Sequence, residues 1–356
     1  MTTLFLIHGR GQHTAPGVPA GQVAEHAEAI RRRWLHALNT GLHDAGRPAI
    51  PDAAPVLFPF YGNAFRDAVA EREGSGPGPD LARWSTGQPL PADVQAVCEV
   101  KAGLIHDVTE LLRFDPDSAS LHPSTRHPES VHPESLHPAV GEPTARGLPA
   151  GVGRPWWELD ELLRVPWLRA ALQFLAERAG VSARVIEEYF TDVAYYLGCA
   201  EVRQTVLAIV ERALADVPMG EPVVVAGHSL GSVVAYDALI RGAQGRSIAL
   251  VATTGSPLGL PVVQRHLLGG AGDGPVPVPA VVPARSGAWV NGYDVRDVVA
   301  ILNPLGPRLE QAAAAQVRDV RVGSGDEPHA VIGYLENAAV AEPIGHAVVS
   351  GSRAVP

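Results

Sequence analysis

A serine flanked by glycines interrupts the apolar segment 222–240, which reads PVVVAGHSLGSVVAYDALI. The residues before GHSLG are typical of a buried strand, and those after it have a helical pattern. This context predicts that Ser229 occupies a sharp strand-to-helix turn, which lifts its hydroxyl out of the top of a sheet. The first amides of the helix then point toward the same place, where they would stabilise a developing oxyanion. We therefore expect Ser229 to be a nucleophile.

A serine hydroxyl needs a base within hydrogen-bond reach, and the base needs a carboxylate that orients it. In a doubly wound hydrolase these partners follow the serine in the order acid, then histidine. His329, in PHAVIGYL, follows the last strand pattern and is the best candidate base, since His266 precedes the acids and His346 lies far beyond that strand. The candidate acids are Asp294 and Asp297, in NGYDVRDVVA.

An early loop could supply the second half of an oxyanion hole. The apolar run Leu4–Ile7 is followed by HGRG, residues 8–11. The amide of Arg10 could then pair with that of Leu230 across a substrate carbonyl. A dinucleotide-binding interpretation of this loop fails, because Thr14 stands where the G-x-G-x-x-G pattern needs its last glycine.

Neighbouring residues are expected to support these two loops rather than to react. His8 and His228 do not have the chain order that a base requires, so we interpret them as hydrogen-bonding groups that stiffen the turns. The glycines of both motifs let neighbouring backbone pass close by, and these are Gly9, Gly11, Gly227 and Gly231.

The elements that must position these groups are short and apolar. Most of the predicted β-runs lack polar alternation, as strands buried on both faces do. The six runs are Leu4–Ile7, Val56–Phe60, Val223–Ala226, Ser247–Gly255, Ala288–Val295 and Val317–Val322. Helical patterns lie between several of them, at Val23–Leu42, Leu230–Arg241 and Arg308–Gln316. This alternation predicts an α/β fold, with a mainly parallel, doubly wound sheet.

The middle of the chain differs from both ends. We predict a core formed by residues 1–62 and 200–356, and a large helical cap or lid insertion over residues 63–199. Helical patterns cover Ala92–Arg113, Trp157–Arg164, Trp167–Ala179 and Ala183–Leu197, and Glu201–Ala215 leads back into the core. Four tryptophans fall in the insertion: Trp84, Trp156, Trp157 and Trp167. They either line a lid or only pack the insertion against the core.

A five-residue His-Pro repeat lies inside the insertion, within a segment of about residues 115–150. Its histidines are in step, at His122, His127, His132 and His137. A polyproline-like path would separate successive imidazoles by roughly 15 Å, too far for one metal ion. The repeat is therefore interpreted as a flexible linker and not as a metal site.

Composition narrows the class of protein. The 356 residues are 46% hydrophobic and carry a net charge of −10, which argues against a nucleic-acid partner. Two cysteines, Cys98 and Cys199, are expected to be reduced thiols. No signal peptide and no transmembrane segment is indicated, so we expect a cytoplasmic protein. A single lysine against many arginines is typical of a GC-rich bacterium.

Taken together, these motifs resemble the α/β-hydrolase superfamily, in particular its lipase- and esterase-like bacterial members. The matching pieces are FLIHGRG, VVVAGHSLGSVVAYDAL, TTGSPLGL, WVNGYDVRDVVA and PHAVIGYL, whereas the insertion has no match. In such relatives the aspartate of a D-[IV]-V element is the acid of the catalytic triad. This favours Asp297 over Asp294. The resemblance implies an α/β-hydrolase fold and a carboxylic ester hydrolase that acts through an acyl-enzyme, without metal or cofactor, on a small-molecule or lipid-like acyl substrate.

Several alternatives remain open from the sequence. The same triad serves peptidases or amidases, thioesterases and acyltransferases, because it attacks any activated carbonyl. A non-catalytic binding protein would be expected to lack a triad member. Activation at a lipid surface is a further possibility raised by the aromatic insertion. The sequence gives no indication of the oligomeric state.

Overall fold

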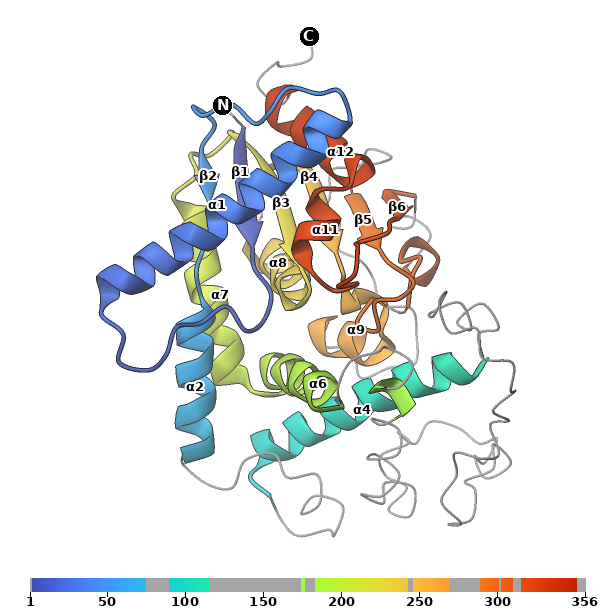
Figure 1. The fold of residues 1–356 in the computed structure, drawn as a ribbon. Coiled ribbons are helices and arrows are strands. Elements are labelled where there is room, and N and C mark those ends of the chain that lie inside the picture. The colour runs from blue at the N-terminus through green and yellow to red at the C-terminus, as the bar shows by residue number, and fades with distance from the viewer. Residues whose placement is uncertain are drawn as a thin grey trace.

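A computed structural model describes residues 2–74, 90–114, 174–176, 183–242, 246–268, 289–300, 302–309 and 315–350. Its centre is a six-stranded parallel sheet in the order β2-β1-β3-β4-β5-β6 (Figure 1). The strands are β1 (Thr3–Ile7), β2 (Val56–Leu57), β3 (Pro222–His228), β4 (Ser247–Thr254), β5 (Trp289–Tyr293) and β6 (Val317–Arg321). The predicted α/β class and parallel sheet are confirmed.

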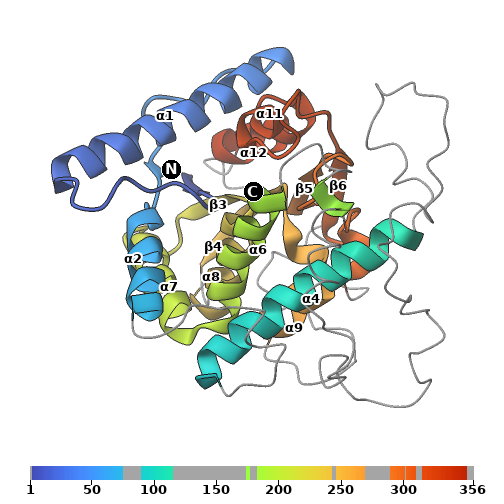
Figure 2. The ribbon, with the colours of Figure 1, turned by 60° about the horizontal axis from the view of Figure 1, so that its bottom comes forward.

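Both faces of the sheet are covered by helices, and the inner strands β1 and β3 are buried along almost their whole length. The edge strand β6, with the sequence VRDVR, is only partly buried. Leu4 and Leu6 of β1 pair in register with Val224 and Ala226 of β3, and all four face one core cluster. That cluster is closed by α1 (Ala20–Asp44), α11 (Val331–Leu335) and α12 (Ala338–Ser350). The alternate residues of the strands face α7 (Ala200–Ala215) and α8 (Leu230–Gly242) on the other side (Figure 2).

Further helices lie beyond the carboxyl ends of the strands. Figure 1 shows α4 (Ala92–Phe114), α6 (Ala183–Gly198) and α9 (Pro261–Leu268) at this end of the sheet. The turn η5 (Pro257–Gly259) joins β4 to α9, and α2 (Gly62–Gly74) packs against α7. Helices α4 and α6 pack on each other, with Lys101 Nζ 3.1 Å from Glu187 Oε1. Parallel strands gather their following loops at their carboxyl ends, so α6 lies over the edge where chemistry is expected.

Several predicted elements differ from the structure. The expected strand Val56–Phe60 is regular only at Val56–Leu57, where it pairs with β1 at the edge of the sheet. In place of a helix over Arg308–Gln316, residues 306–308 form the 3₁₀ turn η6, and residues 310–314 lie outside the described residues. The predicted helix Trp157–Arg164, most of Trp167–Ala179, the four insertion tryptophans and the His-Pro repeat also lie outside them. Residues 174–176 are helical.

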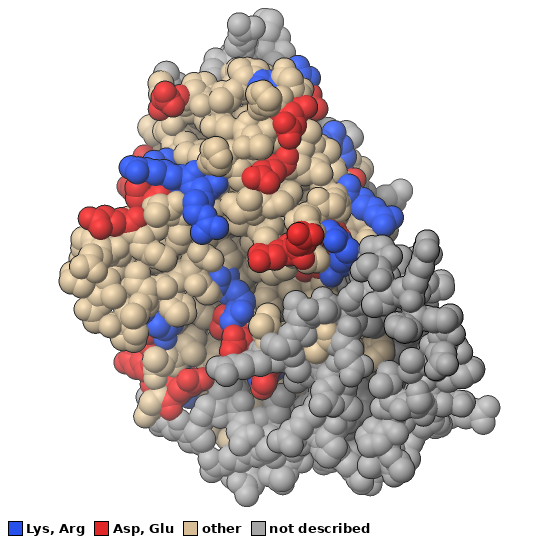
Figure 3. All heavy atoms as spheres, viewed as in Figure 1, with Lys and Arg blue, Asp and Glu red and all other residues tan. Residues whose placement is uncertain are grey.

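Acidic and basic side chains are interspersed on the face drawn in Figure 3, among a larger area of uncharged residues. Within the described ranges, no single helix has both the length and the apolar composition of a membrane span. Residues 185–198 and 200–215 pass that test only when they are joined across a bend of 87°. The two cysteines, Cys98 and Cys199, are buried and form no disulfide.

Candidate active site

The turn between β3 and α8 holds Ser229 in an unusual backbone conformation. Its φ of 58° is left-handed, and among the described residues no other non-glycine has a positive φ. Such a conformation is strained for a residue with a side chain, and backbone strain of this kind clusters at functional sites. The Ser229 amide donates to Thr254 O at 3.0 Å, which ties the turn to β4. Leu230 begins α8, so its N–H has no carbonyl partner one turn earlier.

The loop after β1 lies directly against this turn. A Cβ at Gly231 would collide with the carbonyl oxygens of Ile7 and His8. A Cβ at Gly9 would lie 2.9 Å from Ser229 Cβ and 3.3 Å from its Oγ. Only glycine fits at these two positions, and the fit brings the backbone that leads into Arg10 against the serine side chain.

Three side chains from separate parts of the chain form a hydrogen-bonded series at this turn. His329 Nε2 lies 3.0 Å from Ser229 Oγ, and His329 Nδ1 lies 2.8 Å from Asp297 Oδ2. Ser229 is 2% exposed and the Asp297 side chain is fully buried, whereas the His329 side chain is about one third exposed. A carboxylate at Nδ1 favours the tautomer that carries its proton there. The Nε2 lone pair is then free to accept the serine proton.

The Asp297 carboxylate is itself held by two further donors. The Val299 amide donates to Oδ1 at 3.0 Å, and the Tyr334 hydroxyl donates to Oδ2 at 2.8 Å. Burial, and next the negative charge of Asp297, raise the pKa of Tyr334 well above its ordinary value, so its hydroxyl keeps its proton. Tyr334 was not among the predicted residues, although it lies in the same PHAVIGYL segment as His329.

Asp294 has different partners and does not approach His329. Its Oδ1 accepts from the Arg296 amide at 2.9 Å, and its Oδ2 accepts from the Ser324 amide and hydroxyl, each at 2.9 Å. Burial raises the pKa of Asp294, but the hydrogen bonds from Arg296 and Ser324 outweigh it, and the pKa is lowered overall. Asp294 therefore ties the end of β5 to the segment that precedes His329.

The two loop histidines are buried and make local hydrogen bonds. His8 Nε2 accepts from the Tyr61 amide at 3.1 Å, and the two rings stack with centroids 4.0 Å apart. Burial lowers the pKa of His8 to about 4. His228 Nδ1 lies 3.1 Å from Thr254 O, and burial lowers its pKa well below the ordinary value. Both are neutral at neutral pH and fix the positions of their loops.

The remaining predicted glycines have different surroundings. A Cβ at Gly227 would lie 2.6 Å from Gly231 O, so this position is enclosed by the start of α8. Gly11 has open space around it, but its φ of 72° favours glycine.

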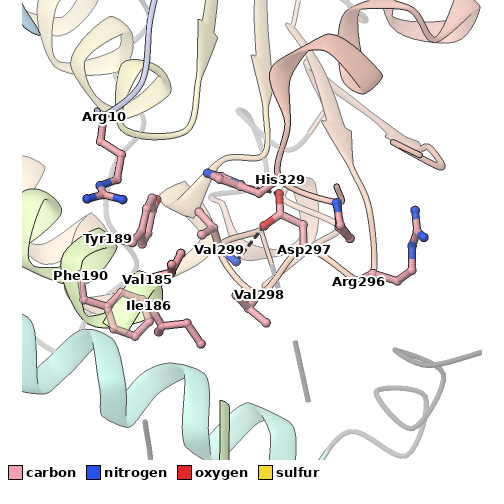
Figure 4. Close-up of a pocket in the computed structure, with 11 residues that line it drawn as sticks. Arg10, Val185, Ile186, Tyr189, Phe190, Arg296, Asp297, Val298, Val299 and His329 are labelled. Carbon is pink, nitrogen blue, oxygen red and sulfur yellow. Dashed lines mark hydrogen bonds and ion pairs between the residues drawn. The ribbon is translucent and has the colours of Figure 1, made fainter. Parts of the chain in front are cut away.

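A cavity of about 130 Å³ opens beside His329 and Asp297. Its wall is mostly apolar and is contributed by α6, by the residues after β5 and by one proline: Val185, Ile186, Tyr189, Phe190, Val298, Val299 and Pro328. Arg10 and Arg296 lie at opposite sides of it (Figure 4). The cavity is similar in size to one that holds a benzene molecule.

The Arg10 side chain links the core to α6. Its Nε donates to Asp192 Oδ2 at 2.6 Å, and its terminal nitrogen lies 3.5 Å from Glu188 Oε2. Sequence reasoning assigned only the backbone amide of Arg10 and missed this pairing. No pattern in the sequence indicates it, because α6 is distant in the chain and its partners are ordinary surface residue types.

Comparison of the chain with protein-family models, with curated proteins and with solved structures gave no match. Among the described residues, no group of three or more His, Cys, Asp or Glu side chains is arranged to hold a metal ion.

Proposed function

We propose that this protein is a serine hydrolase of the α/β-hydrolase type, which cleaves a carboxylic ester with Ser229, His329 and Asp297. The observation that carries the proposal is the series of hydrogen bonds from carboxylate to imidazole to serine, at 2.8 and 3.0 Å, which ends on a left-handed serine at the carboxyl end of a central strand. The strand order and the sequence motifs also support it.

Acylation begins when Ser229 Oγ bonds to the ester carbonyl carbon and its proton passes to His329 Nε2. The π electrons of the carbonyl move onto its oxygen, where the amides of Arg10 and Leu230 would stabilise the charge. Asp297 stabilises the imidazolium. When the carbon–oxygen bond to the alcohol breaks, the carbonyl re-forms and Nε2 gives its proton to the leaving oxygen.

Deacylation follows the same path with water as the nucleophile. The water oxygen bonds to the acyl carbon while one of its protons passes to His329 Nε2. The bond to Oγ then breaks and the proton on Nε2 returns to Ser229, which releases the carboxylic acid. Each step uses groups of this chain and water.

The cavity bears on the substrate class. The mostly apolar wall next to His329 suits an apolar acyl group. Helix α6 contributes much of its wall, so the segment between α2 and α7 would decide which acyl groups are accepted.

A fluorophosphonate probe tests the proposal, because it phosphonylates an activated serine with loss of fluoride. We expect one adduct, on the peptide that contains Ser229, and none with Ser229→Ala. His329→Ala should label far more slowly while remaining folded. A folded wild-type protein that takes no adduct, or an adduct that persists in Ser229→Ala, would contradict the proposal.

Matched substrates then identify the acyl chemistry. An ester, a thioester and an anilide with the same short acyl group should be compared, with and without an added amine or alcohol acceptor. We expect the ester to have the highest kcat/KM and water to be the acceptor. A preference for the anilide or thioester, or acyl transfer to the added acceptor, would replace the esterase assignment.

A further inference from the structure

The hydroxyl of Tyr189 on α6 is buried without a hydrogen bond of ordinary geometry to any described residue. The residue as a whole is 3% exposed. Leaving a buried hydroxyl unsatisfied costs on the order of 1–3 kcal/mol, so such a group in a folded protein calls for an explanation. One explanation is that the hydroxyl donates a hydrogen bond to a substrate oxygen when substrate is bound.

Tyr189 lies directly beside the reacting groups. Its ring meets the His329 ring edge-on, with centroids 5.5 Å apart and an interplanar angle of 81°. Its hydroxyl is close enough to the Ser229 hydroxyl for that group to oppose the effect of burial on the Tyr189 pKa. Figure 4 shows the side chain at the cavity between Arg10 and His329.

The hydroxyl also stays protonated. Burial raises the pKa of Tyr189 well above its ordinary value, and the negative charge of Asp297 acts in the same direction. The phenol is therefore a hydrogen-bond donor at neutral and alkaline pH. A donor that is already fixed in place stabilises developing negative charge without the reorganisation that water requires.

We propose that Tyr189 is a catalytic residue, whose hydroxyl donates a hydrogen bond to the tetrahedral oxyanion alongside the amides of Arg10 and Leu230. This inference rests on the proposed function of the site. The phenol keeps its proton throughout, so the proton transfers at His329 are unchanged. It also means that part of the oxyanion hole comes from α6, the helix that Asp192 ties to Arg10.

Tyr189→Phe tests this role because it removes only the oxygen and keeps the ring against His329. We expect kcat/KM for a short-chain ester to fall by about 10²-fold, mostly in kcat, as for other lost oxyanion donors. Tyr195→Phe is the matched control, since Tyr195 lies on the same helix and its hydroxyl donates to Glu73 at 2.9 Å. It should stay within about twofold of wild type.

Two readouts separate this role from a structural one. A trifluoromethyl ketone forms a tetrahedral adduct with an anionic oxygen, and Tyr189→Phe should weaken its binding by the same factor as kcat/KM. Ethyl and 4-nitrophenyl esters of one acid should lose activity equally. A larger loss for the ethyl ester would mean that Tyr189 donates to the leaving alcohol instead, and would overturn the proposal.

The outcomes also separate this proposal from the one on which it depends. If wild type is labelled at Ser229 and hydrolyses esters, but Tyr189→Phe matches it in rate and in ketone binding, only the role of Tyr189 is overturned. Both proposals fail together if folded wild-type protein neither labels nor turns over any of the matched acyl substrates.

Discussion

Asp294 and Asp297 are close in the chain, but their carboxylates serve different neighbours. Asp297 contacts His329, Tyr334 and the Val299 amide, whereas Asp294 contacts Arg296 and Ser324. Both are almost fully buried, so burial does not distinguish them. The two aspartates differ in the groups that their carboxylates contact. Replacing each aspartate by the isosteric asparagine should therefore have different effects on catalysis and on stability.

Asp297→Asn should lower kcat by about 10³–10⁴-fold while the protein stays folded, because the imidazole loses the acceptor that sets its tautomer. Asp294→Asn should instead lower the free energy of unfolding by about 1–3 kcal/mol, since it weakens buried charge-assisted hydrogen bonds, and change kcat much less. Ester kinetics and urea denaturation of both variants check this. A larger loss of kcat in Asp294→Asn would reverse the assignment.

The candidate site could be predicted from the sequence only where a residue belongs to a local pattern. Ser229 and the glycines around it follow from the strand, turn and helix in a continuous segment. The sequence left Asp294 and Asp297 open, and the resemblance to lipase-like enzymes favoured the residue that contacts His329 in the structure. Tyr189 and Tyr334 reach the site through tertiary packing. Tyr189 lies in no motif, and Tyr334 lies in PHAVIGYL, where the pattern indicated a role for His329 alone.

At the scale of elements, the loop after β1 packs tightly against the first turn of α8. Gly231→Ala places a methyl group against two backbone carbonyls, which cannot move without distorting β1. We expect it to cost about 3 kcal/mol or more of stability, or to abolish folding. Gly21→Ala, in α1 with open space around it, should be neutral or stabilising by up to about 1 kcal/mol. Thermal unfolding of the two variants compares them, and similar losses would refute the tight junction.

The ion pair between Arg10 and Asp192 should stabilise α6 more than an exposed ion pair stabilises its own helix. The Arg10 and Asp192 side chains are 25% and 23% exposed, against 55% and 42% for Arg47 and Glu342. Asp192→Asn should speed hydrogen exchange of the α6 amides at least several-fold, whereas Glu342→Gln should change exchange very little, as is usual for exposed pairs. Unchanged exchange in α6 would show that packing alone holds the helix.

Elements were predictable where the apolar pattern was strong and continuous. Helix α12 was not predicted, because Pro343 in its interior usually ends a helix and Gly345 weakens one. Close packing against α1 accounts for the helix. Glycine at position 345 permits this packing, because a side chain there would collide with Leu42 of α1. Tertiary contact of this kind outweighs local propensity and cannot be read from one segment.

At the scale of the whole molecule, buried histidines make stability depend on pH. Burial lowers the pKa of His8 from 6.5 to about 4, so the unfolded chain binds more protons than the native protein between those values. Stability should therefore fall as the pH falls, by about 2 kcal/mol between pH 7 and pH 5 from His8 alone. His228 acts in the same direction.

Urea denaturation at a series of pH values measures this dependence. His8→Gln should be less stable at pH 7, but should lose less stability than wild type on going to pH 5. An equal loss in both proteins would mean that other groups dominate the acid sensitivity.

The order of the strands in the sheet also determines how long β1 waits for its partner strand during translation. Strand β1 lies inside the sheet, next to the short edge strand β2, but its other neighbour β3 follows only after residues 8–221 have been made. At about 5–20 residues per second, that interval is on the order of 10–40 s. During it, Leu4, Phe5, Leu6 and Ile7 have no β3 to pair with, although each is at most 1% exposed in the folded protein. Most of the sheet therefore assembles late in translation, even though the internal strand β1 is synthesised before the other strands.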